Sequence, residues 1–177
     1  MYFSYSGNLC RKCFLRLIEA RVRKYARLQN VFKKDDRILV IDKLSTFLIR
    51  RIVGDLPFKM FNKKYKISQL KTPLVNTFIK KKRINKIIIP WTIDDECCMF
   101  LEHLFVGKTT KLKYYSLMLT MTDEEALLFA GYNTISFKPL KKNKEIQAIM
   151  RTLEEKYPET KFSLVKSVKE MRKILGS

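Results

Sequence analysis

Three acidic residues in a row, Asp94, Asp95 and Glu96, follow an apolar run at positions 86–90. Carboxylates that come directly after a buried strand are candidates for metal binding or proton transfer. They also suit the first turn of a helix, because Asp94 is a good N-cap and acids there relieve the positive end of the helix dipole. The structural role accounts for all three residues, and catalysis by Asp94 and Asp95 is the alternative.

The four cysteines form two pairs with different spacing. Cys10 and Cys13 make a CxxC element, which is half of a tetrahedral zinc site with four nitrogen or sulfur ligands. Three interpretations stay open for it: a metal site completed by a dimer partner, a disulfide, and a remnant without metal. Adjacent residues on a helix point about 100° apart, so Cys97 and Cys98 are expected to be buried rather than to chelate together.

The sequence carries 37 Lys and Arg against 17 Asp and Glu, a formal charge of +20. Such an excess favours polyanionic partners, and structured RNA is the one expected here; the alternative is a solvated surface that serves solubility. The bases that would meet phosphates gather in three clusters: Arg11, Arg16, Arg23, Lys24 and Arg27; Lys80, Lys81, Lys82 and Arg83; and Lys141 and Lys142. No RNP motif, zinc-finger spacing or helix-turn-helix signature accompanies them. Contacts are therefore expected mainly to phosphates, with a steep salt dependence.

Alternating helices and strands are expected to position these residues. Apolar periodicity and capping signals predict helices at 11–31, 46–53, 74–83, 94–106, from Thr122 onward, at 143–157 and from Ser167, and strands at 37–42, 86–90 and 134–137, with a short extended piece at 161–165. Residues 58–72 show no clear pattern. The alternation predicts an α/β fold, a Rossmann-like parallel sheet with helices on both faces, preceded by a basic N-terminal helix. Ligands of such sheets bind beyond the carboxyl ends of the strands, which here are residues 42–46 and 90–96.

The composition also bounds the compartment. No apolar run approaches the roughly 20 residues of a membrane span. The first residues lack the long apolar core and the small-residue cleavage site of a secretory signal. A cytoplasmic protein is therefore expected.

Four segments, in order along the chain, resemble one known family. Residues 9–40, LCRKCFLRLIEARVRKYARLQNVFKKDDRILV, resemble the start of the PP-loop ATPases that thiolate tRNA, the two-thiouridine synthetase type, with their CxxCF element, their IExRVRK helix and the strand before SGGKDS. IIIPWTIDDECCMFLEHLFVG is similar to the family's segment around GHNLDDE. FKPLKKNKEIQAIM and RTLEEKYPETKFSLVKS are similar to its IKPL…EKEV and LEEKYPGTKFSLLKS segments. The resemblance implies a PP-loop-like (HUP-like) α/β domain at 35–177, preceded by a CxxC remnant and basic helix at 1–34.

The nucleotide loop of the family is altered in this sequence. SGGKDS wraps ATP phosphates with glycine amides, because only glycine lets the backbone approach so closely. The matching stretch, ILVIDKLSTFLI, contains no glycine and is about three residues short. Asp42, Lys43 and Ser45 stand as remnants of the motif, and the Asp42 carboxylate would oppose a phosphate.

The second motif and the cysteines depart as well. Asp94, Asp95 and Glu96 match the family's acids, which are implicated in handling Mg-nucleotide or the activated base, but Pro-Trp-Thr replaces Gly-His-Asn at 90–92. Residues 3–7, the counterpart of the family's first CxxC, contain no cysteine, and neither do residues 54–85, where sulfur-handling cysteines are expected. The resemblance therefore implies a degenerate, non-catalytic relative that binds tRNA or a tRNA-modifying partner.

Cofactors follow from the same reasoning. None is expected, except for zinc or an iron–sulfur group at Cys10 and Cys13 if a partner completes the site. ATP and Mg belong only to the alternative, an active ATP-dependent tRNA sulfurtransferase with a divergent loop. A third alternative is a structural partner in a homodimer or heterodimer.

Overall fold

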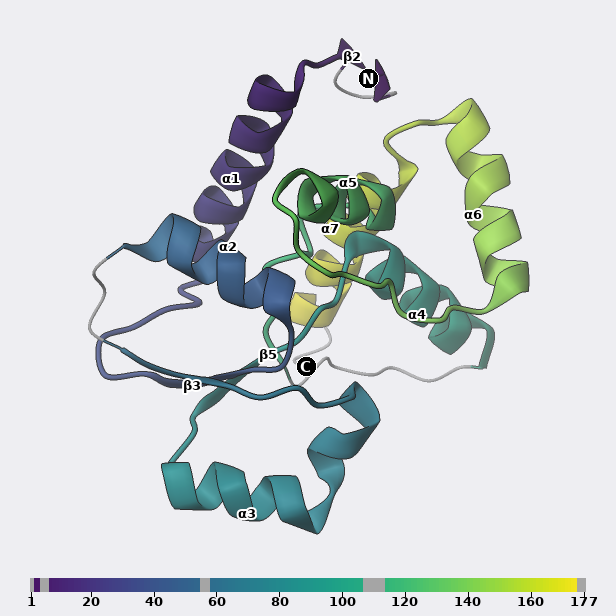
Figure 1. Ribbon diagram of the computed structural model, residues 1–177. Helices are drawn as coiled ribbons and strands as arrows, with labels where there is room; N and C mark the ends of the chain where they lie inside the picture. Colours follow the sequence, from purple (N-terminus) through teal and green to yellow (C-terminus); the bar gives the residue numbers. More distant parts are fainter. Residues whose placement is uncertain (1, 4–6, 55–57, 107–113, 175–177) are drawn as a thin grey trace.

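The computed structural model describes residues 2–3, 7–54, 58–106 and 114–174 of the chain. Its centre is a parallel sheet of three strands in the order β4-β3-β5 (Figure 1), comprising β3 (Arg37–Val40), β4 (Lys59–Asn62) and β5 (Lys86–Ile88). Ile38 lies opposite Met60 on one side and Lys86 on the other. Beyond β5, Tyr115 extends the parallel pairing, because its N–H donates to Ile87 and its carbonyl accepts from Ile89.

Helices cover both faces of the sheet. On one face lie α1 (Arg11–Leu28), α2 (Lys43–Val53) and α5 (Asp123–Tyr132), and on the other lies α3 (Pro73–Lys82) after the short 3-10 helix η1 (Ile67–Lys71) (Figure 1). The alternation of β3 explains this, because neighbouring residues of a strand point to opposite faces. Ile38 and Val40 join the core under α1 and α2, whereas Leu39 packs with Val75 of α3. The predicted Rossmann-like sheet with helices on both faces and a basic N-terminal helix is confirmed.

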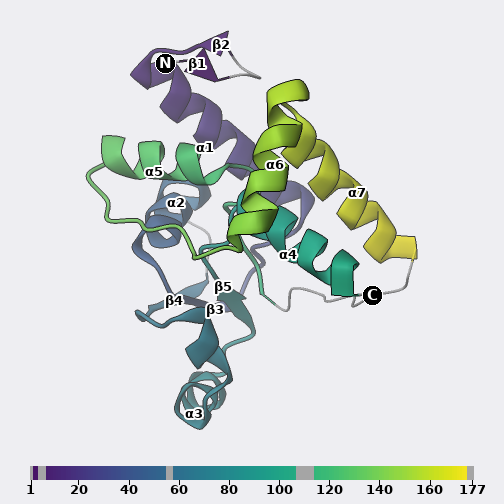
Figure 2. The same cartoon turned by 90° about the vertical axis from the view of Figure 1, so that its right-hand side faces the viewer.

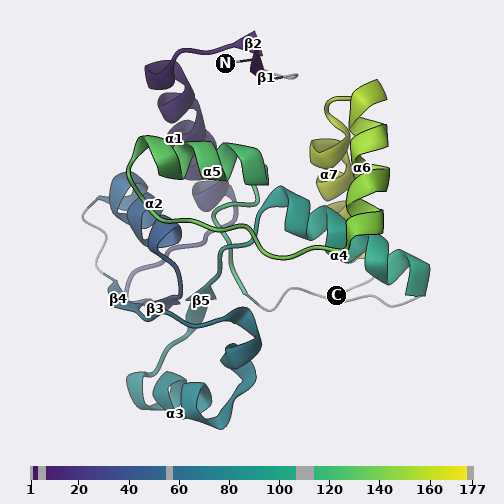
Figure 3. The ribbon, with the colours of Figure 1, turned by 45° about the vertical axis from the view of Figure 1, so that its right-hand side comes forward.

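Three further helices pack together beside β5: α4 (Ile93–Val106), α6 (Lys144–Lys156) and α7 (Thr160–Ile174) (Figures 2 and 3). Their shared core contains Cys97, Cys98, Ile146, Met150 and Val165. The expected burial of both α4 cysteines is confirmed. Two short strands at the N-terminus, β1 (Tyr2–Phe3) and β2 (Gly7–Asn8), pair antiparallel.

Two predicted elements are wrong. Residues 134–137 form no strand, because α5 ends there in a turn: Thr134 has a φ of +56° and Ile135 N–H donates back to the Ala130 carbonyl. Residues 161–165 are helical rather than extended, and the last helix begins at Thr160 instead of near Ser167. The β-branched and aromatic residues of both segments favour strands locally, but tertiary packing overrides that preference.

Two helix starts also shift. α2 begins at Lys43 rather than at Thr46, because Asp42 caps it. α4 begins at Ile93, so Asp94 lies within the first turn and is not the N-cap. Thr92 takes that place: its N–H donates to Asp95 Oδ2 and its Oγ1 accepts from Asp95 N–H, a reciprocal capping pair. Within the described residues, no helix has the length and apolarity needed to cross a membrane.

Candidate functional site

The carboxyl ends of β3 and β5 lead into the two segments that the sequence singled out. Because the strands are neighbours and parallel, residues 42–46 and 90–96 leave the sheet at the same edge. α2 and α4 start there, so their first turns form the candidate site.

The first turn of α2 is closed by Asp42. Its Oδ1 accepts from Ser45 N–H at 2.7 Å, and Thr46 Oγ1 donates to the Asp42 carbonyl at 2.8 Å. A carboxylate thus occupies the position where free N–H groups of a helix N-terminus would bind a phosphate. Burial raises the pKa of Asp42. Asp42 Oδ2 and Ser45 Oγ are buried without a hydrogen-bond partner among the described residues, and Lys43 is exposed.

In the first turn of α4, Asp95 binds a lysine that comes from much later in the chain. Lys142 Nζ lies 2.6 Å from Asp95 Oδ1 and 2.6 Å from Asp123 Oδ2, and its side chain is 3% exposed. Thr92 Oγ1 lies 2.7 Å from Asp123 Oδ1 and closes the cluster. Burial opposes the charged form of Lys142, but hydrogen bonds to Asp123 and Asp95 outweigh it, so the pKa of Lys142 is raised.

Asp94 is paired in the same way. Lys161 Nζ lies 2.6 Å from Asp94 Oδ1 and 2.7 Å from Glu154 Oε2. The pKa of Lys161 is raised, because the charge of Asp94 and the hydrogen bonds outweigh the effect of burial. A cleft of about 590 Å³ opens beside both pairs, between the first turns of α4 and α5 and the helix α6.

Asp94 and Asp95 are thus neutralised by lysines of this chain, whereas Glu96 accepts a hydrogen bond from Trp91 Nε1. In a working metal or nucleotide site, such carboxylates would bind a metal cation. Here the ammonium groups of Lys142 and Lys161 take that position. Among the described residues, no group of three His, Cys, Asp or Glu is placed to hold a metal ion. The geometry therefore supports an ion-paired structural cluster at Asp94 and Asp95.

The cysteines lie in two separate places. Cys10 is the N-cap of α1, where its Sγ accepts from Cys13 N–H at 3.4 Å, and both thiols are free and exposed. That backbone hydrogen bond lowers the pKa of Cys10, whereas the hydrogen bond with Cys10 raises the pKa of Cys13. Burial raises the pKa of Cys97 and raises that of Cys98 to about 11. Iron–sulfur clusters are commonly held by four Cys thiolates, and each of these two places provides two.

The predicted basic residues do not form one surface. Those of α1 are exposed, and Arg11 also donates to the Tyr132 carbonyl of α5; the set is Arg11, Arg16, Arg23, Lys24 and Arg27. Lys80, Lys81, half-buried Lys82 and exposed Arg83 lie at the end of α3, across the sheet from α1 (Figure 1). Lys141 is exposed. Lys142, which was expected to contact phosphates, instead has a buried side chain paired with Asp95 and Asp123.

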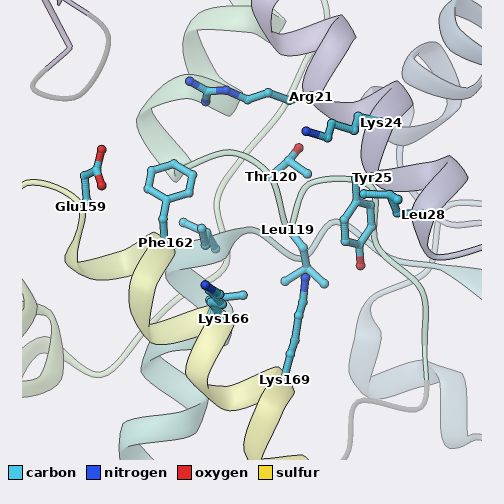
Figure 4. A pocket seen from close by; sticks show the side chains of 12 residues that line it. Arg21, Lys24, Tyr25, Leu28, Leu119, Thr120, Glu159, Phe162, Lys166 and Lys169 are labelled. Atoms are coloured by element: carbon cyan, nitrogen blue, oxygen red, sulfur yellow. The ribbon is translucent and has the colours of Figure 1, made fainter. Parts of the chain in front are cut away.

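A basic cleft that the sequence analysis missed lies between α1 and α7 (Figure 4). Its volume is about 550 Å³, and its cations are Arg21, Lys24, Lys166 and Lys169. The cleft could not be predicted from an extended segment at 161–165, because Lys166 and Lys169 lie on the same face as Phe162 only when this segment is helical. The signal was present: an aromatic and two lysines at 162, 166 and 169 follow helical i, i+4, i+7 spacing.

Comparisons with known proteins place the fold. No protein-family model matches the sequence, and no curated protein matches it. The structure is similar to that of the U34-tRNA thiolase NcsA from Methanococcus maripaludis, solved with its [4Fe-4S] cluster, with a TM-score of 0.72 over 97% of this chain and 84% of that chain. The sequences are 14% identical over the match. The likeness defines the class: this chain is an α/β protein of PP-loop-like fold.

Proposed function

We propose that this chain is a non-catalytic relative of the tRNA-thiolating PP-loop proteins that binds tRNA or another structured RNA. The ion-paired acid cluster carries the proposal, since Lys142 pairs with Asp95 and Lys161 pairs with Asp94, where catalysis would need a free carboxylate or a metal. The absence of glycine between Gly7 and Gly54 and the carboxylate cap at Asp42 add to it. The shared fold with a tRNA thiolase and the charge of +20 favour RNA as the partner.

The nucleotide half of the proposal is tested by thermal melting with Mg-ATP. A ligand that binds only the folded state at 100 times its dissociation constant stabilises it by about 2.7 kcal/mol, which raises Tm by roughly 5–10 °C in a chain of this size. We expect no rise at millimolar Mg-ATP. A rise of several degrees would contradict the non-catalytic assignment.

The RNA half is tested by tRNA binding at increasing NaCl. Contacts made mainly to phosphates lose affinity steeply between about 50 and 200 mM salt, because each neutralised phosphate releases counterions. We expect binding at low salt with such a slope. Absence of binding at 50 mM NaCl, or affinity that salt does not change, would remove RNA as the partner.

One observation favours the active-enzyme alternative. Asp42 Oδ2 and Ser45 Oγ are buried at the start of α2 without partners among the described residues, and buried polar atoms normally have one. Because these atoms have almost no exposed surface, a nucleotide or a partner subunit would supply it only after the first turn of α2 rearranges. The Mg-ATP experiment decides this alternative too, and adding a candidate tRNA-modifying partner to the same assay tests completion of the site in a complex.

A further inference from the structure

The cleft between α1 and α7 combines two kinds of surface (Figure 4). Tyr25 of α1 and Phe162 of α7 provide aromatic rings, while Ile93 and Leu119 add apolar lining. Four cations, Arg21, Lys24, Lys166 and Lys169, surround it, against one acid, Glu159. A volume of about 550 Å³ falls within the roughly 300–1,000 Å³ of pockets that bury small ligands.

Arg21 and Lys169 make cation–π contacts with the two aromatic rings of the cleft. Arg21 is anchored by an ion pair to buried Glu125 at 2.8 Å, and its guanidinium carbon lies 5.8 Å from the Phe162 ring centroid. Lys169 Nζ lies 4.8 Å from the centroid of the Tyr25 ring. Each ring is thus braced by a cation, which lowers the entropy that ordering the rings on binding would cost.

The other two cations face solvent. Lys24 and Lys166 are exposed, one on each helix. Burial and the charge of Glu96 raise the pKa of Tyr25 to about 12, so its phenol is neutral and does not repel an anion. Positive charge therefore lies at the mouth of the cleft, and apolar and aromatic surface lies within.

This combination matches the two halves of a nucleotide. Proteins that bind single-stranded nucleic acid pair aromatic rings, on which bases stack, with cations that follow the backbone. Structured RNA offers such nucleotides in loops and bulges, where unstacked bases are exposed. An acidic peptide would contact the cations but not the aromatic rings, and a lipid tail would contact the rings but not the cations.

We propose that the cleft between α1 and α7 receives one unstacked nucleotide of a bound RNA, with the base against Tyr25 and Phe162 and the flanking phosphates at Lys24 and Lys166. This inference rests on the proposed function and names the part of the RNA that the protein recognises.

The test is fluorescence anisotropy with two labelled RNA hexamers, one of mixed sequence and one of the same length with abasic sites at its central positions. Stacking of one base is worth about 1–3 kcal/mol, so the wild type should bind the complete hexamer about fivefold tighter or more. Phe162→Leu, which keeps the side chain apolar, should reduce the difference between the hexamers, because only the Tyr25 ring remains for the base. The double variant K24E/K166E should weaken binding of both. K64E/K71E, at two exposed lysines before and within η1, changes the net charge equally and should bind both hexamers like the wild type.

Several results would overturn the inference. Equal affinity of the wild type for both hexamers, or wild-type affinity in K24E/K166E, would do so. So would an equal loss in K64E/K71E, or ATP displacing the hexamer from the wild type as well as unlabelled hexamer does. Failure of the cleft is distinguishable from failure of the proposed function: salt-dependent tRNA binding retained by K24E/K166E would reject the cleft alone. Circular dichroism melts of each variant, required to match the wild type, separate lost binding from lost folding.

Discussion

At the scale of single residues, Lys142 neutralises Asp95 in the first turn of α4. Its ammonium touches Asp95 and Asp123 at 2.6 Å each, with 3% of the side chain exposed. Lys161 makes the corresponding contacts with Asp94 and Glu154. Buried pairs of this kind add little net stability over apolar packing, but removing one partner is costly because the other charge stays buried.

Lys142→Met should therefore destabilise the protein by about 3–5 kcal/mol, because two carboxylates lose their counter-charge. Urea unfolding at pH 7 measures this. Lys141→Met removes the exposed neighbouring lysine and should change the free energy of unfolding by less than about 0.5 kcal/mol. Adding Asp95→Asn to Lys142→Met should recover part of the loss. A Lys142→Met protein as stable as the Lys141→Met control would contradict the ion-paired cluster.

Asp42 gives the protein a pH-dependent stability that arises from burial of its carboxyl group. Burial raises the pKa of Asp42 in the folded state, so its contribution to stability is full below the unfolded pKa, near 3.8, and is lost as pH rises through the folded pKa. Asp42→Asn keeps a capping side chain without the charge, so its stability relative to the wild type should increase between pH 4 and pH 7. Asp42→Ala, which removes the cap, should cost roughly 0.5–2 kcal/mol. Urea unfolding at both pH values is the measurement, and a pH-independent difference for Asp42→Asn would argue against a raised pKa.

At the scale of elements, the amino ends of β3 and β5 are joined by a second buried pair. Asp36 precedes β3, and its Oδ2 lies 2.7 Å from Nζ of Lys86, the first residue of β5. Asp36 also accepts from Lys33 N–H and from Asn85, and Lys86 donates to the Val31 carbonyl. These contacts set the two strands side by side at the edge opposite the candidate site.

Asp36→Asn should lower the free energy of unfolding at pH 7 by about 3–5 kcal/mol, because Lys86 stays buried without its counter-ion. Burial opposes the charge of Asp36, but the bonds from Lys86, Lys33 and Asn85 prevail and lower its pKa below 3.8. Its contribution is thus present above about pH 4 and lost as pH falls through the folded pKa, so the mutant should lose less stability than the wild type on acidification. Asp35→Asn is the matched control, since Asp35 is exposed with a φ of +65° that asparagine tolerates. Equal effects of the two variants in urea unfolding would refute the structural pair.

At the scale of the whole molecule, the charge of +20 is divided among separate surfaces. Arg21 and Lys24 of α1 meet Lys166 and Lys169 of α7 at one cleft, while the bases at the end of α3 lie across the sheet. Like charges repel in the folded state, and salt screens exposed charges far more than buried pairs such as Lys142–Asp95.

Raising NaCl from 20 to 200 mM should therefore raise Tm by a few degrees, because repulsion between exposed bases weakens more than the buried pairs do. K80E/K81E, which lowers the net charge by four, should show a smaller rise. Differential scanning calorimetry measures both, and a fall in Tm with salt would show that screened attractions outweigh the repulsion.

Much of this architecture was predictable from local patterns. The apolar period of α1, the strand-like runs at β3 and β5 and the capping box of Thr122 at α5 depend on residues within a few positions of one another. The family-like segments predicted the PP-loop-like fold, which the structural comparison confirms. Local signals failed at 134–137 and 161–165, where β-forming residues sit in a turn and a helix.

The amino-acid sequence alone was enough to place Asp42 and Asp94–Asp95 after two parallel strands and to show that no glycine lies between Gly7 and Gly54. Only the tertiary structure showed that Lys142 and Lys161 reach those acids, and that Lys166 and Lys169 face Arg21 and Lys24 across a cleft. The physical reason is the distance along the chain over which each interaction acts. Periodicity and capping act within one or two helical turns, whereas an ion pair between α4 and α7 depends on the packing of apolar faces that brings distant segments together.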